Sequence, residues 1–292
     1  MTKTLNIGGQ LIDLATPKVM GILNVTPDSM GILNVTPDSF FSGSRVLQVE
    51  AAYKQADKML AEGATFLDVG GHSTRPNAEG VAEEEELARV LPVVEMLHQR
   101  FPEAVVSIDT FRASVARQAV AVGAHLVNDI AGGNLDDAMF ATVAQLGVPY
   151  ILMHSRGTPQ TMTQLNHYDD LVTDVLRELQ AKIAQLRQLG VKDIVADLGF
   201  GFAKNADQNY VLLRELSTFQ MLDVPLLVGV SRKSMIWRKL DISPDAALNG
   251  TTVLNTVALL NGASILRVHD VREAMEAVRL VSLLQNTGTQ ST

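Results

Sequence analysis

Cysteine is absent from the 292 residues, and its absence excludes several kinds of chemistry. Without a thiol the chain forms no disulfide, no thiolate nucleophile and no cysteine-ligated zinc site. The redox compartment stays open on this evidence, and we expect a cytoplasmic protein. Basic residues are also few, with 24 lysines and arginines against 32 acidic residues and a formal net charge of −8. That balance argues against nucleic-acid binding, which needs a basic surface, but allows a small anionic ligand held by a few cations.

Long apolar runs and nucleotide-binding loops are missing as well. No apolar stretch reaches the length of a membrane span, and the N-terminus lacks the apolar core of a signal peptide. We therefore expect no membrane association and no targeting segment. The G-x-G-x-x-G fingerprint, the Walker phosphate loop and the G-x-S-x-G nucleophile elbow do not occur. These absences disfavour a Rossmann oxidoreductase, a nucleoside-triphosphate hydrolase and an α/β-hydrolase.

What the chain does contain is a regular alternation of short apolar runs and longer segments of helical periodicity. The expected strands cover residues 19–25 or 30–35, 65–70, 104–109, 126–130, 149–154, 193–197, 225–231 and 264–269. The expected helices lie near 46–62, 82–100, 112–122, 136–146, 168–190, 206–218, 244–261 and 271–285. Eight such units predict a single (β/α)8 barrel, with an open doubly wound sheet as the alternative.

The domain organisation follows from the same alternation. Few linker-like segments interrupt it, so residues 1–292 are predicted to form one domain. Residues 1–18 would be a short N-terminal cap, and 286–292 a polar tail without fixed structure. One perfect repeat stands out: the ten residues 20–29, MGILNVTPDS, recur at once as residues 30–39. A single tandem copy is a local duplication, since repeat architectures need several stacked units.

Polar residues gather at the C-terminal ends of the predicted strands. Strands of a covered parallel sheet should be apolar throughout, and a polar group in mid-strand costs a few kcal/mol unless it is paired. Barrels of this type carry their chemistry at the C-terminal rim, so the pattern predicts an active site there. The residues are Asn34 (or Asn24), Asp68, Asp109, Asn128, His154, Asp197, Lys233, Arg267 and His269.

The charges at this rim suggest a ligand with two different ends. With a side-chain period of two, Arg267 and His269 share one face of the last strand. Cations gathered there imply an anion such as phosphate or pyrophosphate. The opposite wall offers acceptors and an amide, which suit a flat heterocycle with amide and amino groups. The expected cations are Arg232, Lys233, Arg267 and His269, and the opposite wall is Asp109, Asn128 and Asp197.

For other polar residues a structural role is at least as good an explanation. Asp68 could make only a structural hydrogen bond at its strand end, and His154 could be a buried, satisfied histidine. The run Glu83–Glu86 falls in the first turn of a helix, where acids complement the helix dipole, and we expect it to be solvated. Scattered histidines without ligand spacing predict no structural zinc site.

Eight segments, in order over nearly the whole chain, resemble the dihydropteroate synthase family. They are MGILNVTPDSF, DVGGHSTRP, SIDT, VNDI, ILMHSRGTPQTM, ADLGFGFAKN, VGVSRKSMI and ILRVHDV. The resemblance implies a (β/α)8 barrel, usually homodimeric, that joins 6-hydroxymethyl-7,8-dihydropterin pyrophosphate to p-aminobenzoate. The products are 7,8-dihydropteroate, a folate precursor, and pyrophosphate. Mg²⁺ assists pyrophosphate departure in this family, and sulfonamides mimic the aminobenzoate.

Carried over motif by motif, the resemblance assigns residues to each substrate. Pterin binding falls to Asp109, Asn128, Met153, Asp197, Phe202, Lys233 and Arg267. Pyrophosphate binding falls to Asn34, Arg267 and His269, with Asn34 also close to Mg²⁺ (Asn24 if the first copy forms the strand). Aminobenzoate binding falls to Phe40, Thr74, Arg75, Pro76, Ser231 and Lys233. The residues expected to carry catalysis are Asn34, Asp109, Lys233, Arg267 and His269.

The implied reaction is a substitution at the pterin methylene with much carbocation character. Pyrophosphate leaves first and the aromatic amine then attacks, so catalysis comes mainly from electrostatics and positioning. No strong base is needed before attack.

The sequence departs from the family pattern at several positions. Leu198 stands where the family has proline, His72 where it has glutamate, and Ser42 where it has a loop aspartate. The duplication adds a further question, because only one copy can occupy the first strand. We expect the second copy to do so, since the extra chain then lies far from the rim. The alternative places the first copy in the strand and lengthens the following loop by ten residues, at small entropic cost.

Two other functions are compatible with part of this family resemblance. A pterin-dependent methyltransferase shares the barrel and the pterin wall, but the SRKSM and STRP segments favour the synthase. A non-catalytic pterin-binding protein is the other possibility, with activity lost through the duplication and Ser42.

Overall fold

The computed structural model describes residues 3–26, 42–72, 81–158 and 160–286. Within them, parallel strands close into a barrel in the order β10-β3-β4-β5-β6-β7-β8-β9. The strands are β3 (Lys18–Asn24), β4 (Phe66–Gly70), β5 (Val105–Asp109), β6 (Leu126–Asp129), β7 (Tyr150–Met153), β8 (Ile194–Asp197), β9 (Leu226–Val228) and β10 (Ile265–Val268). The predicted (β/α)8 barrel is therefore confirmed.

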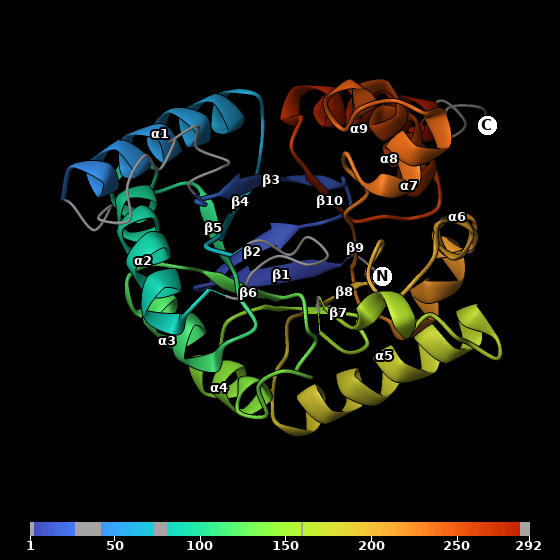
Figure 1. The fold of residues 1–292 in the computed structure, drawn as a ribbon, viewed down its shortest axis with the longest axis horizontal. Helices are drawn as coiled ribbons and strands as arrows, with labels where there is room; N and C mark the ends of the chain where they lie inside the picture. Colours follow the sequence, from blue (N-terminus) through green and yellow to red (C-terminus); the bar gives the residue numbers. More distant parts are fainter. Residues whose placement is uncertain (1–2, 27–41, 73–80, 159, 287–292) are drawn as a thin grey trace.

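Helices surround this barrel (Figure 1). They are α1 (Ser42–Ala61), α2 (Glu83–Arg100), α3 (Ala113–Ala121), α4 (Met139–Leu146), α5 (Leu171–Gln188), α6 (Ala206–Arg214), α7 (Ser234–Leu240), α8 (Leu248–Leu260) and α9 (Val271–Asn286). Short 3-10 helices cover Met162–Gln164, Leu216–Leu222 and Asp245–Ala247. The helix expected at 244–261 is thus split into a 3-10 turn and α8, and α7 was not predicted as a separate element.

The N-terminal cap is an antiparallel hairpin of β1 (Thr4–Ile7) and β2 (Gln10–Asp13). In Figure 1 it lies across the centre of the barrel. Its buried side chains, Leu5 and Ile7, join an apolar cluster that contains one residue from every barrel strand. Those barrel residues are Met20, Phe66, Val105, Leu126, Ile151, Val195, Leu227 and Ile265. The hairpin therefore closes the N-terminal end of the barrel, and the chemistry is left to the other end.

Strand periodicity explains how polar residues enter the barrel above this apolar layer. Side chains two positions apart share a face, so the next layer comes from the residues two positions further along each strand. In order these are Ile22, Asp68, Ser107, Asn128, Met153, Asp197, Gly229 and Arg267. One step of two residues thus changes the interior from fully apolar to largely polar, and this change marks the level at which the site begins.

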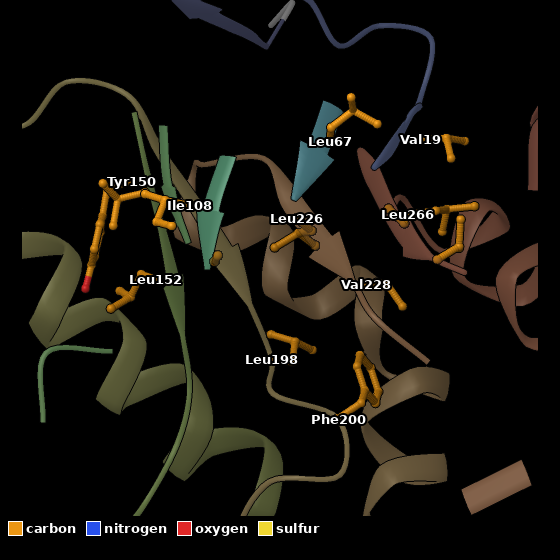
Figure 2. Packing of buried hydrophobic residues seen from close by; sticks show 14 of the residues in the cluster. Val19, Leu67, Ile108, Tyr150, Leu152, Leu198, Phe200, Leu226, Val228 and Leu266 are labelled. Carbon is orange, nitrogen blue, oxygen red and sulfur yellow. The ribbon is translucent and has the colours of Figure 1, made fainter. Parts of the chain in front are cut away.

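A second apolar cluster fills the space between the strands and the helices. It includes alternate strand residues such as Leu67, Ile108 and Leu266 (Figure 2). Leu198 belongs to this cluster and is fully buried beside Phe200. The leucine at the family's proline position therefore serves as a packing residue. Burying a side chain of this size contributes about 1.5–3 kcal/mol.

The first barrel strand is formed by the first copy of the repeat, so our expectation that the second copy forms it was wrong. Lys18 and Val19 extend this strand, where they pair with Ile265 and Leu266 of β10. Val19 is fully buried. With the second copy in the strand, the residues before Met30 would place Asp28–Ser29 at these positions. Ser29 would then occupy the fully buried position of Val19, and burying a hydroxyl without a partner is costly, whereas Val19 fits the core.

Residues 287–292, which cover most of the predicted tail, lie outside the described residues. Within the described part, no helix is both long and apolar enough to cross a bilayer.

Candidate active site

The centre of the site is the buried carboxylate of Asp68. Its Oδ1 accepts a hydrogen bond from Ser107, and its Oδ2 accepts one from the Asn128 amide at 2.9 Å. Arg267, from β10, donates from Nε to the same Oδ2 at 2.6 Å. The structural role considered for Asp68 is therefore what the structure supports. It fixes Asn128 and Arg267, two predicted site residues, in one arrangement.

Asp109 lies beside this centre and has an unused acceptor. Arg267 donates from Nη2 to Asp109 Oδ2 at 2.6 Å, whereas Asp109 Oδ1 is buried and has no hydrogen-bond partner among the described residues. Burial raises the pKa of Asp109 to about 6, although the Arg267 charge opposes this change. A buried acceptor without a partner is costly. Asp109 is therefore prepared to receive a hydrogen-bond donor from a ligand.

Asp197 and Lys233 form the neighbouring wall. Asp197 Oδ1 accepts a hydrogen bond from the Gly199 amide at 2.7 Å. Lys233 donates from Nζ to the Phe200 carbonyl oxygen, and this Nζ lies 4.9 Å from the centre of the Phe202 ring. Burial lowers the pKa of Lys233 to about 8, and burial raises the pKa of Asp197. The wall thus combines donors, acceptors and an aromatic ring.

The turn after β8 has a backbone that only glycine can supply. Gly199 has φ +68°, and a Cβ at this position would lie 2.0 Å from the His154 carbonyl oxygen. The same Cβ would be 3.3 Å from Met153 Cγ. Met153 is 2% exposed and pairs with Asp197 in the barrel. The turn therefore brings Met153 and the Asp197 wall together, as expected for two residues that share one ligand.

Less positive charge is free at the rim than we expected. Arg232 donates to both carboxylate oxygens of Asp270, from Nε at 2.9 Å and from Nη2 at 2.7 Å. Burial, with the Arg267 charge, lowers the pKa of His269 to about 4, so its ring is neutral at pH 7. Arg232 is paired with Asp270, as Arg267 is with Asp68 and Asp109, so neither is the free cation that we expected.

The end of strand seven of the barrel also differs from expectation. β9 stops at Val228 and Arg232 has φ +53°, so the strand expected over 225–231 ends three residues early. Ser231 nevertheless reaches the rim, where its Oγ lies 3.0 Å from His269 Nδ1. Ser231 and His269 thus form a neutral hydrogen-bonding pair beside the Arg267 cluster.

Sequence reasoning missed a buried network behind Asp109. Glu86 is fully buried, although the run Glu83–Glu86 was expected to be solvated. It accepts a hydrogen bond from Thr110 Oγ1 at 2.7 Å and pairs with Arg112. His72 Nδ1 lies 3.6 Å from Glu86 Oε1. Glu86 lies four residues before the buried Val90 of α2, and this helical spacing was the signal in the sequence that Glu86 faces inward.

Five predicted site residues lie outside the described residues, and their roles stay predictions. They are Asn34, Phe40, Thr74, Arg75 and Pro76. The structure does place Asn24 at the end of β3, opposite Gly70 of β4. A Cβ at Gly70 would lie 3.5 Å from Asn24 Oδ1 and from Asp109 Oδ2. Asn24 therefore stands at the same rim as Asp109, on the other side of a glycine.

Comparison with known proteins agrees with this geometry. The family model described as "Pterin binding enzyme" matches residues 30–269. Dihydropteroate synthase of Escherichia coli K12 is 46% identical over 275 residues, which is 94% of this chain and 93% of the relative. The chain belongs to the dihydropteroate synthase family. A crystal structure of the Yersinia pestis synthase with a sulfonamide drug is 42% identical and superposes with a TM-score of 0.87, over 97% of this chain and 99% of that one.

A further solved synthase, from Xanthomonas albilineans with 4-aminobenzoic acid, is 37% identical with a TM-score of 0.87, over 98% of this chain and 99% of that one. The family match begins at Met30, in the second copy, whereas β3 is formed by the first copy. The two copies are identical, so their own residues do not decide between them. The family match takes the second copy, which adjoins Phe40, and the strand pairing takes the first, which adjoins Val19. We follow the strand pairing, since it buries Val19.

The two asparagines can be separated by mutation. We expect Asn24→Ala to lower kcat/KM for the pterin substrate about tenfold to a hundredfold, the usual effect of losing a hydrogen bond to a charged group. Asn34→Ala should change it less. Steady-state kinetics of both variants, with unfolding curves as the control, make the comparison. A larger loss in Asn34→Ala would show that the second copy supplies the strand end.

Proposed function

We propose that this chain condenses 6-hydroxymethyl-7,8-dihydropterin pyrophosphate with p-aminobenzoate to give 7,8-dihydropteroate and pyrophosphate. The observation that carries the proposal is the buried Asp109 Oδ1 beside the Arg267 cluster, which has no hydrogen-bond partner within the part of the chain that the structure describes. A pterin ring presents ring and amino N–H donors that would satisfy such an acceptor. The matching relatives, named as dihydropteroate synthases over nearly their whole length, support the same reaction.

The residues of the wall would hold the pterin edge-on. Asp109, with a pKa of about 6, is mostly ionised at neutral pH and accepts from the ring. Asn128 and Asp197 supply the further polar contacts, and Lys233 donates. Met153 and Phe202 would pack against the ring faces. Buried polar groups in these positions discriminate strongly, because a wrong ligand leaves them unpaired.

The chemistry needs one bond to break and one to form. The methylene C–O bond breaks and its electron pair leaves with pyrophosphate. The aminobenzoate nitrogen then bonds to the methylene carbon, and its proton passes to solvent. Arg267, and His269 as a neutral hydrogen-bond donor, would stabilise the charge on the leaving oxygen. Ser231 and Lys233 would contact the aminobenzoate, together with the predicted residues Phe40, Thr74, Arg75 and Pro76.

Magnesium fits this site with the substrate as its main ligand. Among the described residues, no cluster of three or more histidine, aspartate or glutamate side chains could hold a metal by itself. Mg²⁺ commonly takes one or two protein oxygens and completes its shell with substrate phosphates and water. The Asn24 amide oxygen at the rim would be the protein ligand. Bound there, Mg²⁺ would neutralise charge on the pyrophosphate.

Coupled measurement of pyrophosphate release, with and without p-aminobenzoate, tests the function. We expect release that depends on the aminobenzoate and that a sulfonamide inhibits competitively. Pterin binding without turnover would instead support a non-catalytic pterin-binding protein. Methyl transfer to a corrinoid protein, without pyrophosphate release, would support the methyltransferase.

We also propose that the chain is a homodimer, joined through α8 and α9. These adjacent helices expose several large apolar side chains: Val253, Leu260, Leu280, Leu283 and Leu284, at 49–68% exposure. Exposed apolar side chains gathered on two neighbouring helices indicate an interaction surface. A cytoplasmic location stays our prediction, based on the lack of cysteine.

Light scattering checks the homodimer. The double variant Leu280→Glu/Leu283→Glu should be monomeric, while Met221→Glu, at an equally exposed apolar residue elsewhere, should leave the dimer intact. A monomeric wild-type chain at micromolar concentration would refute it.

A further inference from the structure

Lys204 is a buried lysine to which the reaction gives no role. It lies in the loop between β8 and α6 and is 8% exposed. Its Nζ donates to the carbonyl oxygens of Phe202, at 2.9 Å, and Gly199, at 3.1 Å. It also lies 2.9 Å from His154 Nδ1. An ammonium has three donors, and here each has an acceptor.

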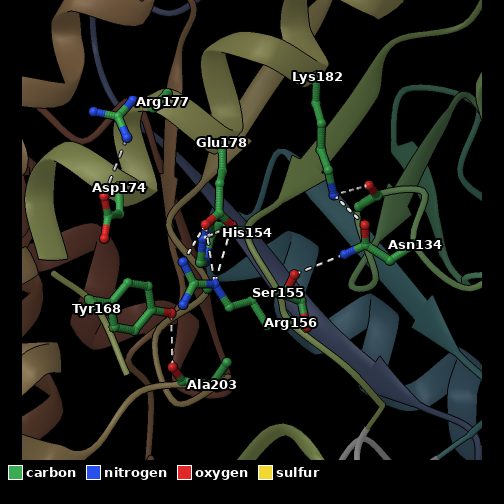
Figure 3. A network of polar contacts seen from close by, with 12 residues as sticks. Asn134, His154, Ser155, Arg156, Tyr168, Asp174, Arg177, Glu178, Lys182 and Ala203 are labelled. Atoms are coloured by element: carbon green, nitrogen blue, oxygen red, sulfur yellow. Dashed lines mark hydrogen bonds and ion pairs between the residues drawn. The ribbon is translucent and has the colours of Figure 1, made fainter. Parts of the chain in front are cut away.

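The histidine partner is held so that it can only accept from Lys204. His154 Nε2 lies 2.9 Å from Glu178 Oε2, and Glu178 also binds Arg156 (Figure 3). Burial, with the Lys204 charge, lowers the pKa of His154 to about 4. A neutral ring that donates from Nε2 to Glu178 must accept at Nδ1. The expected buried, satisfied histidine is thus confirmed, and its tautomer matches a protonated Lys204.

The carbonyl groups bound by Lys204 belong to the loop that carries the pterin wall. Gly199 donates its amide to Asp197 Oδ1, and Phe202 lies under the Lys233 ammonium. Between them and Lys204, Ala203 has φ +51°, a region that non-glycine residues rarely occupy. Its carbonyl oxygen accepts from Tyr168 Oη at 2.9 Å (Figure 3). Such a conformation persists only when its surroundings hold it in place.

We propose that Lys204 is a positioning residue of the pterin site, which holds Asp197 and Phe202 in place through the Gly199 and Phe202 carbonyl groups. This rests on the proposed function, because its effect is on pterin binding. Lys204 itself contacts no substrate. Aminobenzoate binding should be affected less, because of its described residues only Lys233 contacts this loop, whereas Ser231 bonds to His269.

The charge state of Lys204 gives the proposal a pH signature. Burial lowers the pKa of Lys204 to about 7, with Asp197 opposing this change. The charged groups that face it come from several elements: Asp197 on β8, Glu178 on α5, Arg156 after β7, and Lys233 after β9. Loss of the proton leaves two donors for three acceptors, so the loop loosens as the pH rises through about 7. Lys233, with a pKa of about 8, titrates at higher pH.

Lys182 offers a matched control. It also donates to a loop carbonyl group and a side chain, Gly132 O and Asn134 Oδ1, both at 2.7 Å (Figure 3). Burial lowers its pKa as well. Its loop follows β6, so Lys182→Met removes the same kind of anchor without touching the β8–α6 loop.

The experiment compares Lys204→Met, Lys204→Arg and Lys182→Met for pterin binding by fluorescence and for the two KM values, from pH 6 to 9. We expect Lys204→Met to raise the pterin Kd and KM at least about tenfold, since small misplacements have large effects. The aminobenzoate KM should stay within about threefold. Lys182→Met should leave both within about threefold.

The arginine variant keeps its charge throughout this range. In wild type, pterin affinity should fall from about pH 7, and in Lys204→Arg the fall should begin about one pH unit higher. Equal effects of Lys204→Met and Lys182→Met, or an unchanged pH profile in Lys204→Arg, would overturn the proposal. If wild type binds pterin without turnover, the proposed function fails while the binding comparison still decides the role of Lys204.

Discussion

Arg267→Met is expected to reduce kcat/KM for the pterin substrate by about two to four orders of magnitude. Arg267 donates to Asp68 at 2.6 Å and to Asp109 at 2.6 Å, and both carboxylates are buried. Removing one donor that stabilises developing negative charge typically lowers the rate about a hundredfold to a thousandfold, and the two buried carboxylates left without their cation disturb the site further. The loss also removes the cation expected to stabilise the departing pyrophosphate.

Two further variants show whether this loss is specific to the Arg267 geometry. Arg267→Lys keeps the charge but not the planar two-point contact, so it should recover only part of the activity. Arg232→Met removes another paired arginine, bound to Asp270, and kcat/KM should stay within about tenfold. Folded Arg267→Met with kcat/KM close to wild type would show that the cluster does not bind substrate.

Glu86→Ala is expected to lower the free energy of unfolding by about 3–5 kcal/mol, because it leaves the buried His72 and the partly buried Arg112 without their anionic partner. Glu86 is fully buried and binds Thr110 and Arg112, with His72 at 3.6 Å. These partners follow or flank Asp109 in the barrel. The substitution should therefore also weaken pterin binding, although Glu86 is remote from the substrate.

The stabilising effect of Glu86 should depend on pH in a defined direction. Burial alone would raise the pKa of Glu86, but His72, Thr110 and Arg112 lower it below 4.5. Burial alone would lower the pKa of His72, but Glu86 and Asp109 raise it above 6.5. A carboxyl group whose pKa is lowered on folding stabilises the protein above its unfolded-state pKa, and this stabilisation is lost as the pH falls. A histidine whose pKa is raised on folding stabilises the protein below its unfolded-state pKa, and this stabilisation is lost as the pH rises.

The difference in the free energy of unfolding between wild type and Glu86→Ala should therefore be largest between about pH 4.5 and 6.5. Urea unfolding at pH 5.5 and pH 8.5 measures this difference. The control is His98→Gln, at a histidine near the C-terminal end of α2. An equal difference at both pH values would show that His72 is not ionised beside Glu86.

The sequence predicted the barrel and the main site residues because both depend on short-range patterns. Apolar strands repeat eight times, and the period of two places Asp109, Asn128, Asp197 and Arg267 in one interior layer or directly above it. Hydrogen bonds and ion pairs between side chains far apart in the sequence could not be predicted in this way. Asp68 and Arg267 are 199 residues apart, and no local pattern shows that one fixes the other.

Other errors have equally specific causes. Two identical copies carry the same local preferences, so only the neighbouring Val19 decides which one forms β3. Glu86 was expected to be solvated and Arg232 to be unpaired, but each side chain binds a partner in another element of the fold. Lys204 was not noticed, since its partners are mostly backbone carbonyl groups, which sequence letters do not distinguish.

The most direct test of the account is mass-spectrometric detection of 7,8-dihydropteroate made by the purified chain from both substrates, with Arg267→Met measured beside it. The account predicts one dihydropteroate for each pyrophosphate released by wild type, and product formation at least a hundredfold slower in the folded variant. Pyrophosphate release without dihydropteroate, or equal product formation by the two proteins, would contradict it.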